Sequence, residues 1–234
     1  MVKHATHGVN RPPSAYSQTL GRGLRVLEIL RENPGGLGVN GMAAALGAHR
    51  TVIYRLLGTL RAHGLVAQEA DGRFRLGAGL LELAGGVRAD LRVVAEPRLA
   101  ELADDVGATA FLTLAEGDEA VNTCSVEPRR AQLHVGYRVG VRHPLTVSAA
   151  GISILAARPP AAGERAAIAR ARERGYAITA GELEPGAWGL AVALPVRDGE
   201  AEASVGVVAL TELDTERVAG AVRATVRAIA SQLM

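Results

Sequence analysis

Apolar residues recur every three or four positions in the first third of the chain, which is the spacing of one face of an α-helix. The pattern predicts three helices: an amphipathic one that contains Leu20–Leu30, an alanine-rich one over 40–46, and a third over 49–63. Pro34-Gly35-Gly36 ends the first helix, and Gly47 ends the second. Four apolar side chains of the third helix fall on one arc, which faces the domain core. These residues are Ile53, Leu56, Leu57 and Leu60.

A β-hairpin is predicted directly after the third helix. Short strands over 65–67 and 73–76 flank Asp71-Gly72, a dipeptide typical of tight hairpin turns. Helix, turn, helix and hairpin in this order predict a winged helix-turn-helix over 17–78, a structure that inserts one helix into a DNA groove. Residues 1–16 are polar and contain two adjacent prolines, so we interpret them as a disordered arm.

The rest of the chain alternates irregularly between helical and strand patterns. Residues 79–91 are predicted to be a linker with a helix over 80–89, and a second domain is predicted over 92–234. Its expected helices cover 93–106, 146–157, 163–174 and 214–233. Its expected strands cover 108–115, 119–126, 132–139, 175–180, 189–196 and 203–211. These elements predict the α+β class, with helices packed on a sheet.

Charge is distributed unevenly between the two parts. The whole chain has a formal net charge of +2, but residues 1–77 hold ten Lys/Arg and four Asp/Glu, a net charge of +6. Residues 78–234 hold sixteen Lys/Arg and twenty Asp/Glu, a net charge of −4. A polyanionic partner is therefore expected for the amino-terminal part alone.

Composition argues against several other classes of protein. The single cysteine, Cys124, cannot form an internal disulfide, which fits a reducing cytoplasm. No apolar run approaches the roughly 18 residues that a membrane span requires, and the amino terminus has no apolar signal core. The six histidines are scattered, and the sequence has no metal-spaced cluster, glycine-rich phosphate loop or carboxylate pair. We expect a cytoplasmic protein that is not an enzyme, with no catalytic residue, metal, cofactor or membrane partner.

The start and the outward face of the third helix supply the candidate DNA contacts. Arg55 is the first choice for bidentate contact to guanine, worth about 1–3 kcal/mol of discrimination. Tyr54 on the flank suits a phosphate, and Gly58 and Ala62 let the helix lie close in the groove. Arg73, after the hairpin turn, suits the DNA backbone or the minor groove. The full candidate set is His49, Arg50, Thr51, Tyr54, Arg55 and Arg73.

Plainer interpretations of these residues stay open. Arg50, Arg55 and Arg61 also suit an ordinary solvated helix face. His49 also suits a helix cap, although Ser or Asp would serve better. The preceding helix, the turn and the hairpin favour the DNA-binding interpretation.

The ordered motifs of the chain resemble the IclR family of bacterial transcriptional regulators over about residues 17–233. The similar segments are 19–30, 51–66, 72–77, 140–151, 174–177 and 184–186. The resemblance implies a GAF-like effector-binding domain that takes a small molecule, often a carboxylic acid or an aromatic metabolite. It also implies a homodimer or dimer of dimers on a palindromic operator in double-stranded DNA, with repression as the commoner outcome.

The expected effector site lies around the helix over 146–157. Free N–H groups at a helix amino terminus bind a carboxylate or carbonyl oxygen, and small residues leave space there. Alternatively, Thr146 or Ser148 only caps this helix. The candidate ligand-binding residues are Leu145, Ser148, Ala149, Ala150, Trp188, Gly189, Val208 and Leu210.

Several of these positions depart from the family pattern. Thr146 stands where the family usually has His, and Ile152 where it has Lys. Val208 and Leu210 stand where it often has serines, and alternation along a strand puts both on one face. We therefore expect a larger and more apolar ligand than a small keto acid. Trp188 is a candidate for ring stacking, with core packing as the alternative.

Three other functions remain as alternatives. The segment between Pro160 and Arg174 looks short, which allows a degenerate second domain that dimerises and binds no ligand. A GAF-like thiol enzyme would use Cys124, but the chain has no second cysteine to resolve it. A winged-helix module that only bridges proteins is disfavoured by the charge of the amino-terminal part.

Overall fold

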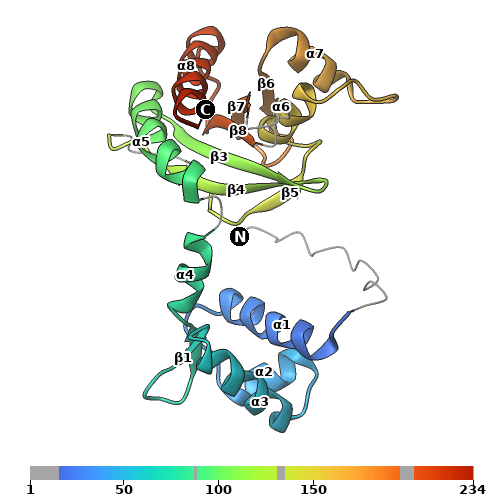
Figure 1. Ribbon diagram of the computed structural model, residues 1–234, viewed down its shortest axis with the longest axis vertical. Helices are drawn as coiled ribbons and strands as arrows, with labels where there is room; N and C mark the ends of the chain where they lie inside the picture. Colours follow the sequence, from blue (N-terminus) through green and yellow to red (C-terminus); the bar gives the residue numbers. More distant parts are fainter. Residues whose placement is uncertain (1–15, 87–88, 131–134, 196–202, 234) are drawn as a thin grey trace. The chain divides into compact units, whose positions relative to one another are not determined.

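A computed structural model of the chain describes residues 16–86, 89–130, 135–195 and 203–233 (Figure 1). Its internal contacts divide the chain into two compact units, Met1–Val87 and Arg88–Met234. Each unit has its own core. The predicted disordered arm lies outside the described residues, except for its last residue, Tyr16.

The first unit is a winged helix-turn-helix, as predicted. Its elements are α1 (Gln18–Glu32), α2 (Val39–Leu46), α3 (Arg50–Ala62), β1 (Val66–Gln68), β2 (Phe74–Leu76) and α4 (Gly79–Gly85). The two strands pair antiparallel and form the wing, with Val66 opposite Leu76. Gly47 ends α2 with a φ of +63°, a left-handed conformation that glycine adopts without strain.

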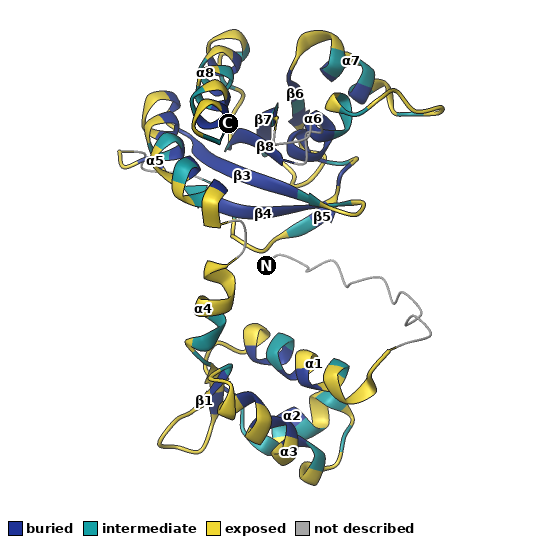
Figure 2. Cartoon of the chain, viewed as in Figure 1, coloured by how far each residue is buried: buried dark blue, intermediate teal, exposed yellow. Residues whose placement is uncertain are grey.

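The apolar arc of α3 faces the core of this unit. Ile53, Leu56, Leu57 and Leu60 are all buried, which confirms the prediction from their spacing. They pack against α1, α2 and the wing, through residues such as Val26, Met42 and Phe74. Because α3 buries this arc, its other side is left to solvent (Figure 2).

The second unit is built on a six-stranded antiparallel sheet. Its elements are α5 (Ala89–Val106), β3 (Thr109–Glu116), β4 (Glu119–Val126), β5 (Arg142–Pro144), α6 (Ala149–Ala157), α7 (Ala166–Arg174), β6 (Ala177–Ala180), β7 (Trp188–Leu194), β8 (Ala203–Ala209) and α8 (Thr215–Leu233). The strand order is β5-β4-β3-β8-β7-β6. The predicted α+β class is confirmed.

Helices cover both faces of this sheet. Helices α5 and α8 pack on one face and enclose the larger core, to which β3 contributes Leu112 and Leu114. Helix α6 packs on the other face, where Phe111 points, and α7 packs on α6 and β6. The alternation of side chains along β3 thus sends successive residues into two separate cores.

Some element boundaries differ from the sequence prediction. No strand forms over the described part of 132–139, since residues 135–140 run as a loop, and the strand that pairs with β4 is β5. The side chain of Asn122 binds the carbonyls of this loop, at Tyr137 and Arg138. The predicted helix over 146–157 begins only at α6, because Ser148 caps it. The predicted linker helix over 80–89 forms only as α4, which ends at Gly85. Helix α5 begins at Ala89, four residues earlier than expected.

Candidate functional site

The predicted DNA contacts on α3 form one exposed surface. His49 is the N-cap of α3: its Nδ1 accepts the Thr51 N–H at 3.4 Å and lies 3.0 Å from the Thr51 hydroxyl oxygen. The capping role considered for His49 is therefore present, and it orders the first turn of the helix. Tyr54 is 61% exposed on the next turn. We call His49, Arg50, Thr51, Tyr54 and Arg55 the recognition surface.

No described carboxylate neutralises the positive charge of the recognition surface. Arg50 and Arg55 are exposed, and neither forms an ion pair with any residue in the described part of the chain. By contrast, the guanidinium of Arg25 on α1 lies 2.7 Å from Glu28, and that of Arg61 donates to Gln68 on β1 at 3.3 Å. The free donors of α3 thus point to solvent, where a polyanion would meet them.

The wing presents a weaker charge. The guanidinium of Arg73 lies 3.5 Å from Asp71, and Arg75 lies 3.8 Å from Glu69. All four side chains are largely exposed, so each ion pair contributes little and opens at small cost. Arg73 is therefore available for a phosphate, but it must first leave its ion pair with Asp71.

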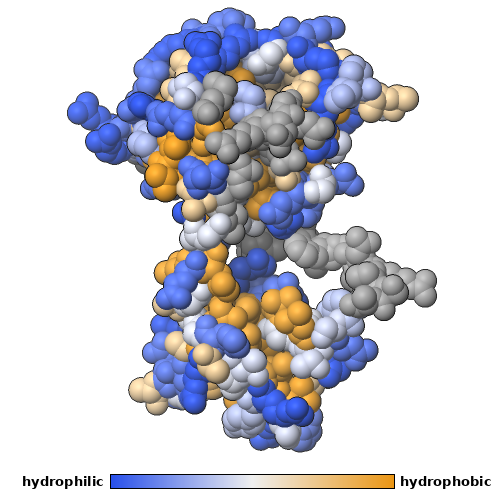
Figure 3. All heavy atoms as spheres, in the orientation of Figure 1, coloured by the Kyte–Doolittle hydropathy of each residue, from blue (hydrophilic) through white to orange (hydrophobic). Residues whose placement is uncertain are grey.

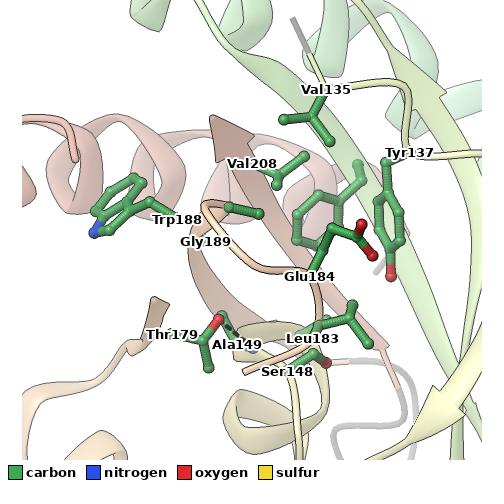
Figure 4. A pocket seen from close by; sticks show the side chains of 13 residues that line it. Val135, Tyr137, Ser148, Ala149, Thr179, Leu183, Glu184, Trp188, Gly189 and Val208 are labelled. Atoms are coloured by element: carbon green, nitrogen blue, oxygen red, sulfur yellow. Dashed lines mark hydrogen bonds between the residues drawn. The ribbon is translucent and has the colours of Figure 1, made fainter. Parts of the chain in front are cut away.

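The second unit contains a cavity between α6 and the sheet (Figure 4). Its cavity volume is about 80 Å³, and it opens to solvent at one side. Its lining residues are Phe111, Val135, Tyr137, Ser148, Ala149, Ala150, Thr179, Leu183, Glu184, Ala187, Trp188, Gly189 and Val208. Six of the eight predicted ligand-binding residues are thereby brought together.

Leu145 and Leu210 do not line the cavity. Leu145 is buried in a separate cluster with Ala120 and Ile154. Leu210 is 46% exposed, because β8 ends at Ala209 and the chain leaves the sheet there. The alternation that placed Val208 and Leu210 on one face requires a strand that continues through both residues, and this strand does not.

The aromatic wall of the cavity differs from the one expected. Trp188 lines the cavity, but its side chain belongs to the core under α5 and α8, and its ring points away in Figure 4. The rings on the cavity side are Phe111 and Tyr137, whose centroids lie 5.1 Å apart at 78°. The indole of Trp188 therefore packs in the core, which is the alternative considered for this residue.

The N–H groups at the start of α6 are mostly occupied. Ser148 Oγ accepts the Gly151 N–H at 3.1 Å, and Thr179 Oγ1 accepts the Ala149 N–H at 3.2 Å. Thr146 is exposed and lies before the helix. Gly151 permits a close approach to the preceding loop, because a side chain there would collide with the backbone of Leu145.

Tyr137 is held in place by a buried histidine. Its hydroxyl lies 2.7 Å from Nε2 of His143, which is 5% exposed. Burial raises the pKa of Tyr137 to about 12, against a smaller lowering by Thr113. Burial also lowers the pKa of His143. Both rings are therefore neutral near pH 7, and this wall carries no charge.

Other chemistry finds no support in the part of the chain that the structure describes. No group of His, Cys, Asp or Glu there is arranged to hold a metal ion. Cys124 is buried, and desolvation raises the pKa of its thiol, which makes a thiolate nucleophile unfavourable. None of the helices in these ranges is long and apolar enough to cross a membrane.

Comparison with known proteins finds a matching domain family for each unit. The IclR helix-turn-helix domain matches residues 19–70, and the bacterial transcriptional regulator IclR C-terminal domain matches residues 86–166. The chain is 33% identical to the HTH-type transcriptional regulator Rv1719 of Mycobacterium tuberculosis over 154 residues, 65% of this chain but only 59% of that protein. It is 28% identical to XynR of Escherichia coli over 85% of this chain and 86% of that protein.

A solved structure has the same fold. It is an IclR homolog complexed with 4-hydroxybenzoate from Microbacterium hydrocarbonoxydans, with a TM-score of 0.79 and 23% identity. The match covers 92% of this chain and 99% of that one. The matched families and relatives are transcriptional regulators rather than enzymes.

Proposed function

The chain belongs to the IclR family of bacterial transcriptional regulators, and on that premise we propose that a small molecule in its second unit controls its binding to one operator sequence. The first unit is the DNA-binding part and the second the effector part. We propose repression as the outcome, because it is the commoner one in this family, and the cytoplasm as the location.

The observation that carries the DNA-binding proposal is the unpaired positive charge of the recognition surface. Helix α3 buries its apolar arc and turns Arg50 and Arg55 outward, where described carboxylates do not reach them. Gly58 and Ala62 on the same side leave room for the groove walls. Arg55 is suited to guanine, and Arg50 near the helix start to a base or a phosphate.

The first unit also carries apolar residues that suit a second copy of the chain. Leu20 and Leu24 on α1 are 63% and 52% exposed, and Leu81 and Leu83 on α4 are 76% and 65% exposed. Hydrophobic residues gather on this unit in Figure 3. We propose that they form a homodimer, whose twofold axis would require a palindromic operator. A dimer of dimers would use a further surface.

The cavity of the second unit is the proposed effector site. Its walls are largely apolar, with Val208, Leu183 and Phe111 among them, which suits a small apolar or aromatic compound. The structural neighbour that holds 4-hydroxybenzoate supports the idea that this fold accommodates such a ligand.

A gel-shift selection with random duplexes tests the proposal. We expect one enriched palindrome, whose affinity falls steeply with salt because phosphate contacts release counterions. Binding without sequence preference would overturn the recognition role. If a broad metabolite panel changes neither operator affinity nor thermal stability, the second unit is instead a dimerisation domain that binds no ligand.

A further inference from the structure

The lining of the cavity carries charge of one sign. Among the described residues that line it, Glu184 alone has a side chain charged at neutral pH, and there is no Lys, Arg or His. Glu184 comes from the loop between β6 and β7 and is solvent-exposed at the mouth. Its carboxylate points toward the Tyr137 ring in Figure 4. An unaccompanied carboxylate at an apolar cavity attracts a cation and repels an anion.

The start of α6, which also lines the cavity, offers little to an anion. A carboxylate at a helix amino terminus needs several free N–H groups. In α6 the N–H of Gly151 is taken by Ser148, and that of Ala149 by Thr179. Among the first three N–H groups of α6, only that of Ala150 has no hydrogen-bond partner within the described ranges. The protein's own side chains therefore take up two of the N–H groups on which the expected carboxylate site depends.

The aromatic wall adds a second preference for positive charge. Phe111 and Tyr137 meet edge to face, and both line the cavity. The electron-rich faces of such rings attract ammonium groups, most strongly where water is partly excluded. Burial keeps Tyr137 a neutral phenol, so the wall acts through its ring alone.

From this arrangement we infer that the effector is an apolar or aromatic molecule with a protonated amine, and that Glu184 selects it over a carboxylate. The apolar body would lie against Phe111 and Val208, and the ammonium group near Glu184 at the mouth. The inference rests on the proposed function, since it assumes that a small molecule occupies this cavity.

Three probes that share a phenyl ring with a two-carbon side chain test the inference on the full chain at pH 7: phenethylamine, 2-phenylethanol and phenylacetate. Calorimetric titration should show that phenethylamine binds about tenfold more tightly than phenylacetate. Glu184→Gln should abolish this preference, and Glu184→Lys should reverse it. Glu182→Gln is the matched control, because it removes the same charge from the same loop at a residue that does not line the cavity.

The possible failures are distinct. If phenylacetate binds best, or if the preference survives in Glu184→Gln, the inference is wrong while the cavity remains an effector site. If none of the three binds at millimolar concentration although the chain still binds its operator, the inference and the proposed effector role of the cavity both fail.

Discussion

The hydroxyl oxygen of Tyr137 lies 2.7 Å from Nε2 of His143, and the two rings stack at 20° with centroids 6.4 Å apart. Tyr137 forms a wall of the cavity, while His143 lies in the edge strand β5. Asn122 holds the loop between them by donating to the carbonyls of Tyr137 and Arg138 at 2.9 and 3.1 Å. The shape of the cavity thus depends on a histidine that is not among its lining residues.

This dependence predicts a loss of stability in mild acid. Burial lowers the pKa of His143 from its usual 6.5, so the unfolded chain takes up a proton that the folded chain resists. The free energy of unfolding should therefore fall as the pH drops below 6.5. Thermal unfolding measured from about pH 7.5 to about pH 5 covers the relevant range.

His143→Gln supplies the control for that measurement, because glutamine keeps a hydrogen bond to Tyr137 but does not titrate. Its stability should vary less with pH over the same range. A pH dependence as steep as that of the unaltered chain would show that other groups are responsible.

The recognition surface predicts a specific loss of DNA affinity. Arg55→Ala should weaken binding to the cognate operator by about 1–3 kcal/mol and relax the choice of base at one position. Arg61→Ala removes the same charge from the same helix, but its guanidinium is engaged by Gln68. Quantitative gel shifts should show a smaller effect for Arg61→Ala, uniform across sequences. Equal losses for both variants would reduce Arg55 to a general electrostatic contact.

The first unit could be predicted in detail because its signals are local. Helical spacing placed Ile53 and Leu57 in the core, and Asp71-Gly72 marked the wing turn. Each of these inferences uses residues within a few positions of one another. The outward direction of Arg55 followed from the same helical spacing, without knowledge of the partner elements.

The cavity could be predicted only in part, because its walls come from distant segments. Phe111 lies in β3 and Glu184 in the loop before β7, and only the sheet order and the position of α6 bring them together. Alternation predicts that Trp188 and Gly189 face opposite ways, but the sequence does not say which face α6 covers. The prediction for Leu210 was wrong for another reason: the strand pattern in the sequence continues to residue 211, but β8 ends at Ala209.

Gly151 should be essential to the position of α6. A side chain at this residue would collide with the backbone of Leu145, so Gly151→Ala must shift α6 away from the preceding loop. We expect a loss of about 1–3 kcal/mol in the free energy of unfolding, measured in urea, together with weaker ligand binding.

Gly220→Ala is the matched control, since Gly220 is exposed on α8 and nothing lies near the added methyl group. It should be neutral, or stabilising by up to about 1 kcal/mol through helix propensity. If Gly151→Ala behaves in the same way, the close contact between α6 and Leu145 does not limit the packing.

The exposed leucines of α1 predict a dimer whose loss also weakens DNA binding. Leu20 and Leu24 lie one turn apart, so Leu20→Gln/Leu24→Gln removes adjacent apolar surface without touching the buried arc of the unit. Sedimentation should show a shift toward monomer, and operator affinity should fall at least tenfold, since one half-site then binds alone. Val139→Gln, at a residue that is 63% exposed in the second unit, serves as the control and should change neither quantity. A double variant that remains dimeric and binds its operator normally would mean that this face of α1 is not the dimer interface.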